Sequence, residues 1–175
     1  MDNFKEQLVK KTPSGKDKVS KIMVLLMGFS LGALVVFITL GFFQSFVPIG
    51  FLIGLGILYG AFLLSLRFDV EYEYIFTNGE IDIDKIIAQR SRKRLVTVKV
   101  SSASDFGVAD DNYQVDNNKT LVLASEASAD CTDYYIEFNH RDLGETSLIF
   151  TPDEDMLELV ESSLPRKIKS QLKQG

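Results

Sequence analysis

The chain has 175 residues and a formal net charge of −5, and this length fits one ordinary domain plus a small addition. Its single Cys excludes an internal disulfide framework, and its hydrophobic fraction of 46% excludes a disordered chain. A simple soluble globule is excluded as well, because residues 22–66 contain no charged side chain and 32 of these 45 residues are hydrophobic.

The N-terminal segment, residues 1–21, begins with a stretch over residues 1–12 that predicts a short amphipathic helix. Phe4, Leu8 and Val9 fall on one side of this helix, lysines lie elsewhere, and Thr-Pro-Ser-Gly at residues 12–15 ends it. Such a helix can lie on the anionic inner leaflet of a membrane, where lysines are attracted to the lipids. The alternative is that the lysines only fix the orientation of the segment that follows.

Residues 22–66 are long enough for two membrane spans, because one helical span needs about 20 apolar residues. We expect helices over about 22–43 and 47–66, with a tight turn at Gln44, Ser45 and Pro48. A helical hairpin satisfies its own backbone hydrogen bonds, as the lipid interior requires. The alternative, a cleaved signal peptide, fits poorly, because the apolar stretch is too long, lacks an Ala-x-Ala-like site and leads directly into a second span.

Charge predicts the orientation of this hairpin. Six lysines precede the first span against three acidic residues, Arg67 follows the second span, and the turn between the spans has no charge. Basic flanks stay in the cytoplasm, so the sequence predicts a multi-pass protein of the cell membrane with both termini cytoplasmic. No ionisable residue lies within the spans, which argues against a proton relay, an ion pathway or a transporter core.

Seven of the twelve glycines lie in the predicted spans. They form three pairs with a spacing of four residues: Gly28 and Gly32, Gly50 and Gly54, and Gly56 and Gly60. Small residues at this spacing let helix backbones approach closely. The spacing favours packing of the two spans against each other, and the alternative is self-association or docking on another membrane protein. An accessory role beside a transporter or a membrane enzyme is a further hypothesis, which rests on these spacings alone.

The first element after the spans is a β-hairpin. Residues 70–76 and 81–87 alternate with a period of two, and Asn78-Gly79 between them is the strongest two-residue turn signal. The turn sets the register and brings together one largely apolar face, on which the predicted pairs are Phe76 with Ile81, Tyr74 with Ile83, Tyr72 with Lys85, and Val70 with Ile87. On the other face Glu73 lies opposite Asp84, an arrangement that requires water or a cation nearby.

Further strands and one helix complete the soluble portion. The predicted strands are residues 95–100, 106–109, 121–124, 134–138 and 146–150, with a mobile polar loop over 110–119. Thr151 is the expected N-cap of the helix, followed by Pro152 and Glu154. Its apolar stripe is Met156, Leu157, Val160 and Leu164, and Pro165 ends it. The basic tail, residues 166–175, has the spacing for a short extra helical turn.

Seven strands closed by one helix are the order of a pleckstrin-homology-like barrel, so residues 67–165 predict a mainly β domain and the chain an α+β membrane protein. Five blocks carry a resemblance: residues 1–11 (MDNFKEQLVKK), 71–79 (EYEYIFTNG), 81–85 (IDIDK), 93–98 (KRLVTV) and 148–152 (LIFTP). Through them most of the chain resembles a family of uncharacterised small two-span membrane proteins of anaerobic Gram-positive bacteria. The Tyr-x-x-Thr-Asn-Gly-x-Ile start is similar to bacterial membrane-anchored PH-like domains. The resemblance implies no activity and supplies no catalytic residue.

No constellation typical of an enzyme is present. His140 lies alone in a predicted turn, and Cys131 lies beside Asp130 and near Asp133, which raise rather than lower the pKa of a thiol. The sequence has no P-loop, GxGxxG, CxxC or HExxH motif, and acidic pairs such as the one at residues 110–111 match no calcium loop. We therefore expect a non-enzymatic protein without a cofactor or a metal. The net charge of −8 over residues 67–175 argues against nucleic-acid binding.

One basic run, formed by Arg90, Arg92, Lys93 and Arg94, reverses the charge of this acidic portion locally. Because guanidinium groups suit phosphate, the run is a candidate for binding anionic membrane lipids. The alternatives are that it pairs with the acidic strand faces, protects an edge strand from aggregation or binds a protein. The leading hypothesis is a two-helix anchor that presents a PH-like domain to a protein partner or a membrane complex. A lipid-sensing module is the alternative.

Overall fold

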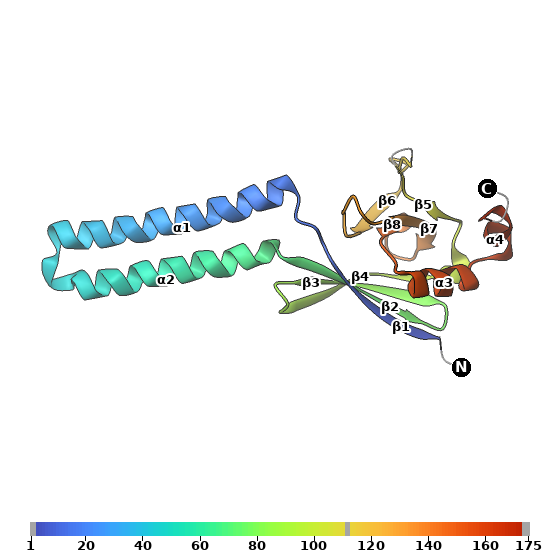
Figure 1. The fold of residues 1–175 in the computed structure, drawn as a ribbon, viewed down its shortest axis with the longest axis horizontal. Helices are drawn as coiled ribbons and strands as arrows, with labels where there is room; N and C mark the ends of the chain where they lie inside the picture. The colour runs from blue at the N-terminus through green and yellow to red at the C-terminus, as the bar shows by residue number, and fades with distance from the viewer. Residues whose placement is uncertain (1–2, 111–112, 173–175) are drawn as a thin grey trace. The chain divides into compact units, whose positions relative to one another are not determined.

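The computed structural model describes residues 3–110 and 113–172 and divides the chain into two compact units (Figure 1). One unit, the helical hairpin, comprises Pro13–Asp69. The other unit, the β unit, combines Met1–Thr12 with Val70–Gly175. The helical hairpin is therefore an insertion into the chain of the β unit.

The helical hairpin consists of α1 (Gly15–Phe42), η1 (Gln44–Phe46), α2 (Val47–Ser65) and η2 (Leu66–Phe68). Ser14 caps α1 in a capping box with Asp17, so α1 begins seven residues before the apolar stretch that predicted it. By length and composition, both α1 and the α2 region are able to cross a membrane. At the end away from the turn, the Lys21 ammonium bonds both carboxylate oxygens of Asp69, at 2.8 and 3.0 Å.

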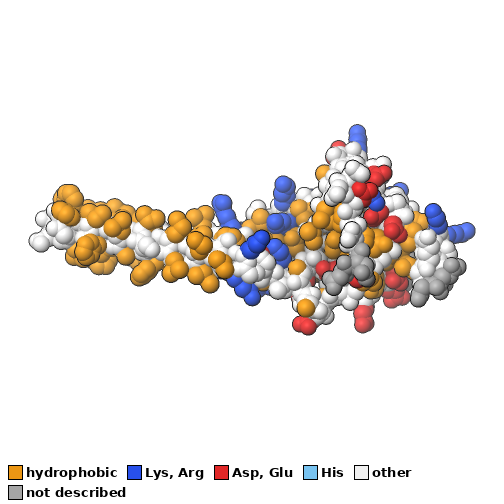
Figure 2. Space-filling model, turned by 90° about the horizontal axis from the view of Figure 1, so that it is seen from above, with side chains coloured by type: hydrophobic (Ala, Val, Ile, Leu, Met, Phe, Trp, Pro, Cys, Tyr) orange, Lys and Arg blue, Asp and Glu red, His pale blue; other side chains and the backbone are white. Residues whose placement is uncertain are grey.

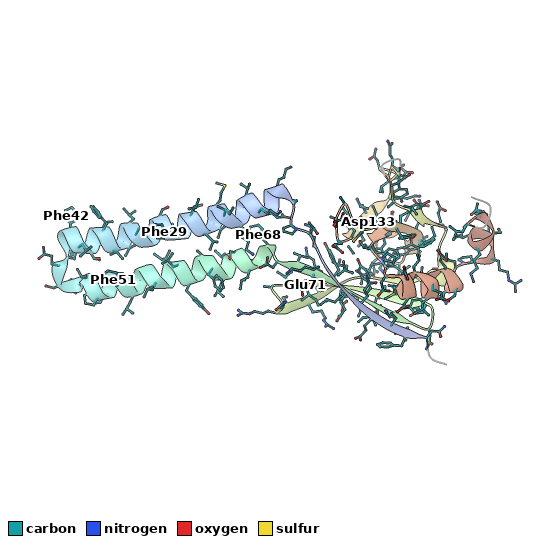
Figure 3. All side chains as sticks on the ribbon, in the orientation of Figure 1. Phe29, Phe42, Phe51, Phe68, Glu71 and Asp133 are labelled. Carbon is teal, nitrogen blue, oxygen red and sulfur yellow. The ribbon has the colours of Figure 1, made fainter. Side chains whose placement is uncertain are left out.

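Large hydrophobic side chains cover the outside of the helical hairpin (Figures 2 and 3). Phe29, Phe42 and Phe51 are exposed, Phe42 to 82%. The buried positions of the two helices are instead small residues: Gly28, Gly32, Gly50, Gly54, Ala61 and Ser65. This hairpin packs through its smallest residues and turns its largest ones outward.

Sheet A is a four-stranded antiparallel sheet in the order β1-β2-β3-β4. Its strands are β1 (Phe4–Lys10), β2 (Val70–Thr77), β3 (Glu80–Ile87) and β4 (Ser91–Lys99). The predicted register of the β2–β3 hairpin is confirmed at all four apolar-face pairs and at the Glu73–Asp84 pair. Asn78 and Gly79 both have positive φ, as the tight turn requires.

Strand β1 corrects the prediction of an N-terminal amphipathic helix. Residues 4–10 are extended and pair with β2 from Phe4–Thr77 to Lys10–Glu71. Val9 is buried in the core, and the Gln7 side chain donates to the Thr151 carbonyl at 3.0 Å and accepts from the Asp153 amide at 2.9 Å. The helical interpretation was wrong because Phe4 and Leu8, four residues apart, are exposed side chains on the outer face of an edge strand.

Sheet B has the order β5-β7-β8-β6, with β6 parallel to β8 and the other pairs antiparallel. Its strands are β5 (Asp105–Val108), β6 (Thr120–Ala124), β7 (Tyr134–His140) and β8 (Gly144–Phe150), and η3 (Val100–Ser102) connects the sheets. All seven predicted strands are present, and β1 is the eighth. Within the described ranges no ladder joins the sheets, so the β unit contains two sheets where one barrel was expected.

Two helices, α3 (Glu154–Ser163) and α4 (Arg166–Leu172), follow sheet B. Asp153 caps α3 by accepting from the Met156 amide at 2.8 Å, so the predicted Thr151 cap was two residues early. Thr151 instead donates to Asp133 at 2.6 Å and accepts from the Glu126 amide at 2.9 Å. The two sheets and both helices share one core, whose fully buried large side chains include Tyr74, Phe76, Ile83, Phe150, Met156 and Val160.

Candidate functional site

The basic run at the start of β4 divides into paired and unpaired cations. Arg92 contacts Glu73 at 2.9 Å, and Arg94 contacts Asp82 at 2.7 Å and also Asp84. The bond to Asp84 raises the pKa of Arg94. For these two arginines the contacts match the alternative in which the run pairs with the acidic face of sheet A. They also explain how Glu73 and Asp84 can lie opposite each other.

The unpaired members of the run are Arg90 and Lys93. Among the described residues neither forms an ion pair, and both are exposed. The strand register places Lys93 directly opposite Lys85, whose ammonium also lacks a carboxylate partner within the described ranges. Two like charges therefore face each other across β3 and β4, which is destabilising unless an anion is close.

The turn between β3 and β4 has an unusual backbone. Ala88 and Gln89 both have a φ of 54°, in the left-handed region that side chains with a Cβ rarely adopt. The Gln89 side chain donates to Glu71 at 3.3 Å, and the Arg90 amide donates to the Ile87 carbonyl at 3.1 Å. These contacts hold a strained two-residue turn beside the unpaired arginine.

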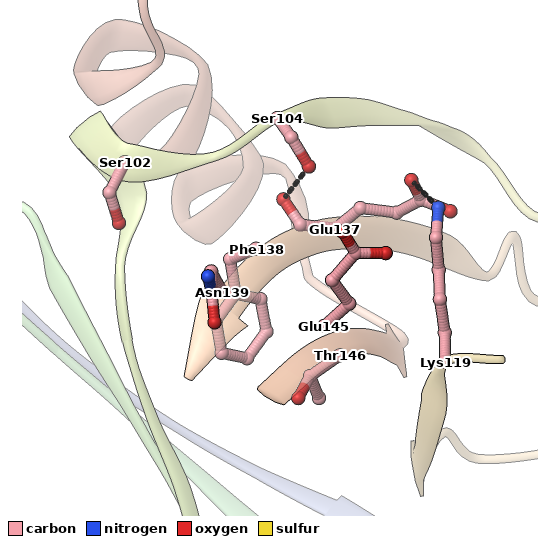
Figure 4. A pocket seen from close by; sticks show the side chains of 8 residues that line it. All are labelled: Ser102, Ser104, Lys119, Glu137, Phe138, Asn139, Glu145 and Thr146. Carbon is pink, nitrogen blue, oxygen red and sulfur yellow. Dashed lines mark hydrogen bonds and ion pairs between the residues drawn. The ribbon is translucent and has the colours of Figure 1, made fainter. Parts of the chain in front are cut away.

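A polar pocket of about 330 Å³ lies on the β unit near the ends of β7 and β8 (Figure 4). Its centre is an ion pair of 2.6 Å between Lys119 and Glu137, and the Ser104 hydroxyl donates to the Glu137 backbone carbonyl at 3.1 Å. The bond to Glu137 raises the pKa of Lys119. Ser102, Asn139, Glu145 and Thr146 complete the lining. The two central charges of the pocket therefore neutralise each other.

Tyr113 covers the neighbouring part of sheet B. Its ring stacks on Tyr135 at a centroid distance of 3.8 Å, and its hydroxyl bonds Glu137 at 3.1 Å and Ser147 at 2.8 Å. Burial raises the pKa of Tyr113. The segment predicted as a mobile loop over 110–119 is therefore fastened to sheet B at Tyr113 and at Lys119, while residues 111–112 lie outside the described ranges.

A groove of about 450 Å³ runs between β5 and the α3–α4 corner. Its lining residues are Phe106, Gly107, Val108, Tyr134, Glu161, Ser162, Lys169 and Leu172. Val108 and Leu172 are exposed to 48% and 41%. Strand β5 is an edge of sheet B, so one side of its backbone pairs with no strand of the described chain. Open backbone groups beside exposed apolar side chains suit an added extended segment.

Helix α4, which contributes Lys169 and Leu172 to the groove, also carries two further basic residues. Arg166 and Lys167 are exposed and form no ion pair among the described residues, and the Lys169 ammonium donates to the Ser162 carbonyl. Residues 67–175 as a whole carry a net charge of −8. The groove itself is lined by one acidic residue, Glu161, and one basic residue, Lys169, so Arg166 and Lys167 belong to the neighbouring surface of α4 rather than to the groove.

The three glycine pairs of the helical hairpin have different surroundings. A methyl group at Gly28 would overlap the Ala61 side chain, and one at Gly50 would overlap Thr39. At Gly32 it would lie 3.0 Å from the Gly54 carbonyl oxygen, and at Gly54 it would lie 3.2 Å from the Gly32 oxygen. At Gly56 and Gly60 nothing lies within 4 Å. The first two pairs serve contact between α1 and α2, and the third does not.

The remaining chemical candidates have ordinary environments. The Cys131 thiol donates to Glu126 at 3.4 Å, and this hydrogen bond raises its pKa, as the acidic neighbours predicted. The His140 ring accepts from the Asp142 and Leu143 amides at 3.2 and 3.3 Å, which stabilises its turn. Within residues 3–110 and 113–172 no group of three or more potential metal ligands comes together.

The sequence singled out Arg90 and Lys93 but gave no role to Lys85, to the groove or to Tyr113. The register of the first hairpin already placed Lys85 on the apolar face, and that misfit was the available signal. The groove depends on β5 and α4, which are 58 residues apart at their nearest ends, so no local pattern shows it.

Among curated proteins, none matches the chain significantly. A family model described as a bacterial PH-like domain matches residues 1–170, so it includes β1, the helical hairpin, both sheets and α3. With nearly the whole chain matched, this protein belongs to the bacterial PH-like domain family DUF6106.

Proposed function

We propose that this protein is a non-enzymatic, membrane-anchored interaction module. The helical hairpin is the anchor, and the β unit is a PH-like domain held at the cytoplasmic face of the cell membrane. The observation that carries the proposal is the pairing of β1 with β2. One strand lies before both apolar helices in the chain and the other lies after them, yet they are neighbours in one sheet.

This pairing restricts the topology. If both helices cross the bilayer, β1 and β2 emerge on the same face and can pair, whereas a single crossing would separate them. Cleavage of α1 as a signal peptide would remove β1 and with it the buried Val9 and the Gln7 hydrogen bonds to the α3 segment. Lysines before the apolar stretch of α1, and basic residues after α2, favour the cytoplasm for that face.

The β5–α4 groove is the surface that we assign to a protein partner. Its open strand edge suits an extended peptide, and the exposed Val108 and Leu172 suit an apolar side chain of that peptide. Because anchoring raises the effective concentration of partners on the same membrane, a groove of this size can serve with modest affinity.

Site-specific photocrosslinking in cells tests this function. A photoreactive amino acid is placed in the full-length chain at Val108 or Leu172, and at exposed Thr77 of sheet A as a control. The proposal predicts a discrete crosslinked product from the two groove positions and none from Thr77. If all three positions behave alike, or if the groove positions give no product, the groove does not hold a partner.

A further inference from the structure

We propose that Lys85, Lys93 and Arg90 form a site for the phosphate group of an anionic lipid. The proposal rests on the membrane anchoring described above and names the ligand that the anchored domain would meet. It replaces the four-residue basic run of the sequence with a different set, because Arg92 and Arg94 are engaged by carboxylates.

Near the β3–β4 turn, the two faces of sheet A differ in whether their charged side chains are paired. On the outer face, Glu73, Asp82 and Asp84 lie within reach of Arg92 and Arg94, so cations and anions balance. On the inner face, Tyr72, Lys85 and Lys93 lie directly opposite one another on β2, β3 and β4, and so form one row across the sheet.

The rows on either side of the lysines contain no carboxylate. One neighbouring row has Tyr74, Ile83 and Val96, and the other has Val70, Ile87 and Ser91. Among the described residues, the lysine pair thus has no counterion on its own face of the sheet. A bound anion would supply the missing negative charge. It would also relieve the repulsion between the two ammonium groups, which face each other across the strands.

The lysines also lie at the end of sheet A that is connected to the helical hairpin. Strand β1 ends and β2 begins there, and the turn from β3 to β4 lies at the same end, because Lys10 pairs with Glu71, and Val70 with Ile87. Only residues 11–14 separate β1 from α1, and only residues 66–69 separate α2 from β2. Even fully extended, each connection spans about 18 Å, so a membrane-inserted hairpin would keep this end of the sheet near the headgroups.

The three side chains suit a phosphate group chemically. Arginine offers a planar fork of donors, and each lysine offers a compact charge with three donors. The strained turn fixes the backbone of Ala88 and Gln89 directly before Arg90. A lipid phosphodiester and a free phosphate ion share this chemistry, and the geometry favours the lipid because the tethers hold the site at the membrane surface.

Lysine acylation of the full-length protein in nanodiscs tests the site. The discs contain phosphatidylcholine alone, phosphatidylcholine with phosphatidylglycerol, or phosphatidylcholine with inorganic phosphate added to the buffer. Mass spectrometry measures the rate at each lysine. We expect Lys85 and Lys93 to react several-fold more slowly in the phosphatidylglycerol discs than in the other two, while exposed Lys99 at the far end of β4 reacts equally in all three.

A matched pair of variants gives a second readout, the amount of phosphatidylglycerol retained by the purified protein. Lys85→Gln with Lys93→Gln should lower it several-fold, and Lys99→Gln with Arg141→Gln, which removes the same charge at exposed positions elsewhere, should not. Equal lysine rates in every disc, or equal retention by the two variants, overturns the site. Equal protection by inorganic phosphate overturns the lipid assignment. Failure of the proposed membrane anchoring would be distinguishable from failure of the lipid site, because the chain would then not enter the discs at all.

Discussion

The helical hairpin and the β unit bury opposite kinds of residue. Of the 31 exposed large hydrophobic side chains in the described ranges, 24 belong to the helical hairpin, whose buried positions are glycine, alanine and serine. In the β unit the large hydrophobic side chains are buried and the acidic and basic ones lie outside (Figure 2). The proposed membrane anchoring explains this difference, because water drives large apolar groups inward, whereas lipid has no such effect and favours close backbone packing.

The largest expected effect comes from separating the two units at the wrong place. A chain that begins at residue 67 lacks β1, so it loses the edge strand of sheet A, buried Val9 and both Gln7 hydrogen bonds. We expect it to aggregate or to lack a cooperative unfolding transition. Residues 1–12 joined to 70–175 by a short glycine-rich loop should instead fold without lipid, as circular dichroism and amide proton dispersion would show. Equal behaviour of the two chains would mean that β1 is dispensable.

A glycine exchange in the helical hairpin should have the next largest effect. Gly28→Leu places a side chain against Ala61, and overpacking of this kind costs about 1–3 kcal/mol. Gly56→Leu is the matched control, because open space surrounds that position. Unfolding by dodecyl sulfate in mixed micelles, followed by circular dichroism, should show a clear loss for the first variant alone. A similar loss for both would place Gly56 in a helix contact.

Much of the β unit could be predicted because its signals are local. The Asn78-Gly79 turn fixed the register of β2 and β3, and alternation located the other strands within a few residues. Strand β1 could not be found this way. Only Val9 of its seven residues is fully buried, and its partner strand begins 60 residues later, beyond two helices.

The cap of α3 and the site at Lys85 show the same limit of local signals. Thr151 and Asp153 both suit the N-cap of a helix, and tertiary contacts decided between them. The Thr151 hydroxyl is already engaged, because it donates to Asp133 and accepts from the Glu126 amide. Lys93 could be set opposite Lys85 only with knowledge of the register shift at Ile83 and Asp84, which displaces the pairing of β4. Long-range pairing, rather than composition, therefore determined which cations remain unpaired.

A smaller effect is expected at the β3–β4 turn, where the β unit stores strain. Ala88→Gly should stabilise the protein by up to about 1 kcal/mol, since glycine adopts a positive φ without the penalty of a Cβ. Ala103→Gly is a matched control, because Ala103 is buried and has a φ of −59°. That variant should be destabilised. Denaturant unfolding of both variants measures the difference, and a loss at Ala88 would show that the turn is not strained.

The smallest effect concerns the attachment of β1 to α3. Lys5 contacts Asp153 at 3.2 Å and Asp155 at 2.7 Å. Hydrogen bonding to Lys5 lowers the pKa of Asp155, and bonding to Asp155 and then Asp153 raises the pKa of Lys5. The stabilising contribution of Asp155 is therefore present above the usual carboxyl pKa of 3.8 and is lost as the pH falls through the lower folded-state value.

Asp155→Asn tests this pH dependence by thermal unfolding. The variant should melt slightly below the native protein at neutral pH, by a small amount because the pair is exposed. The difference should disappear in acid, below the pH at which Asp155 titrates. A difference that persists in acid would assign the effect to packing rather than to charge.

The central claim is that one domain is interrupted by two membrane crossings, and the most direct measurement is cysteine accessibility in intact cells. With Cys131 retained in one variant, and replaced by Ser in variants carrying Glu6→Cys or Ser45→Cys, a membrane-impermeant maleimide reports the side of each position. The account predicts that residues 6 and 131 react only after the membrane is opened, whereas residue 45 reacts in intact cells. Labelling of residues 6 and 131 from opposite sides would contradict it.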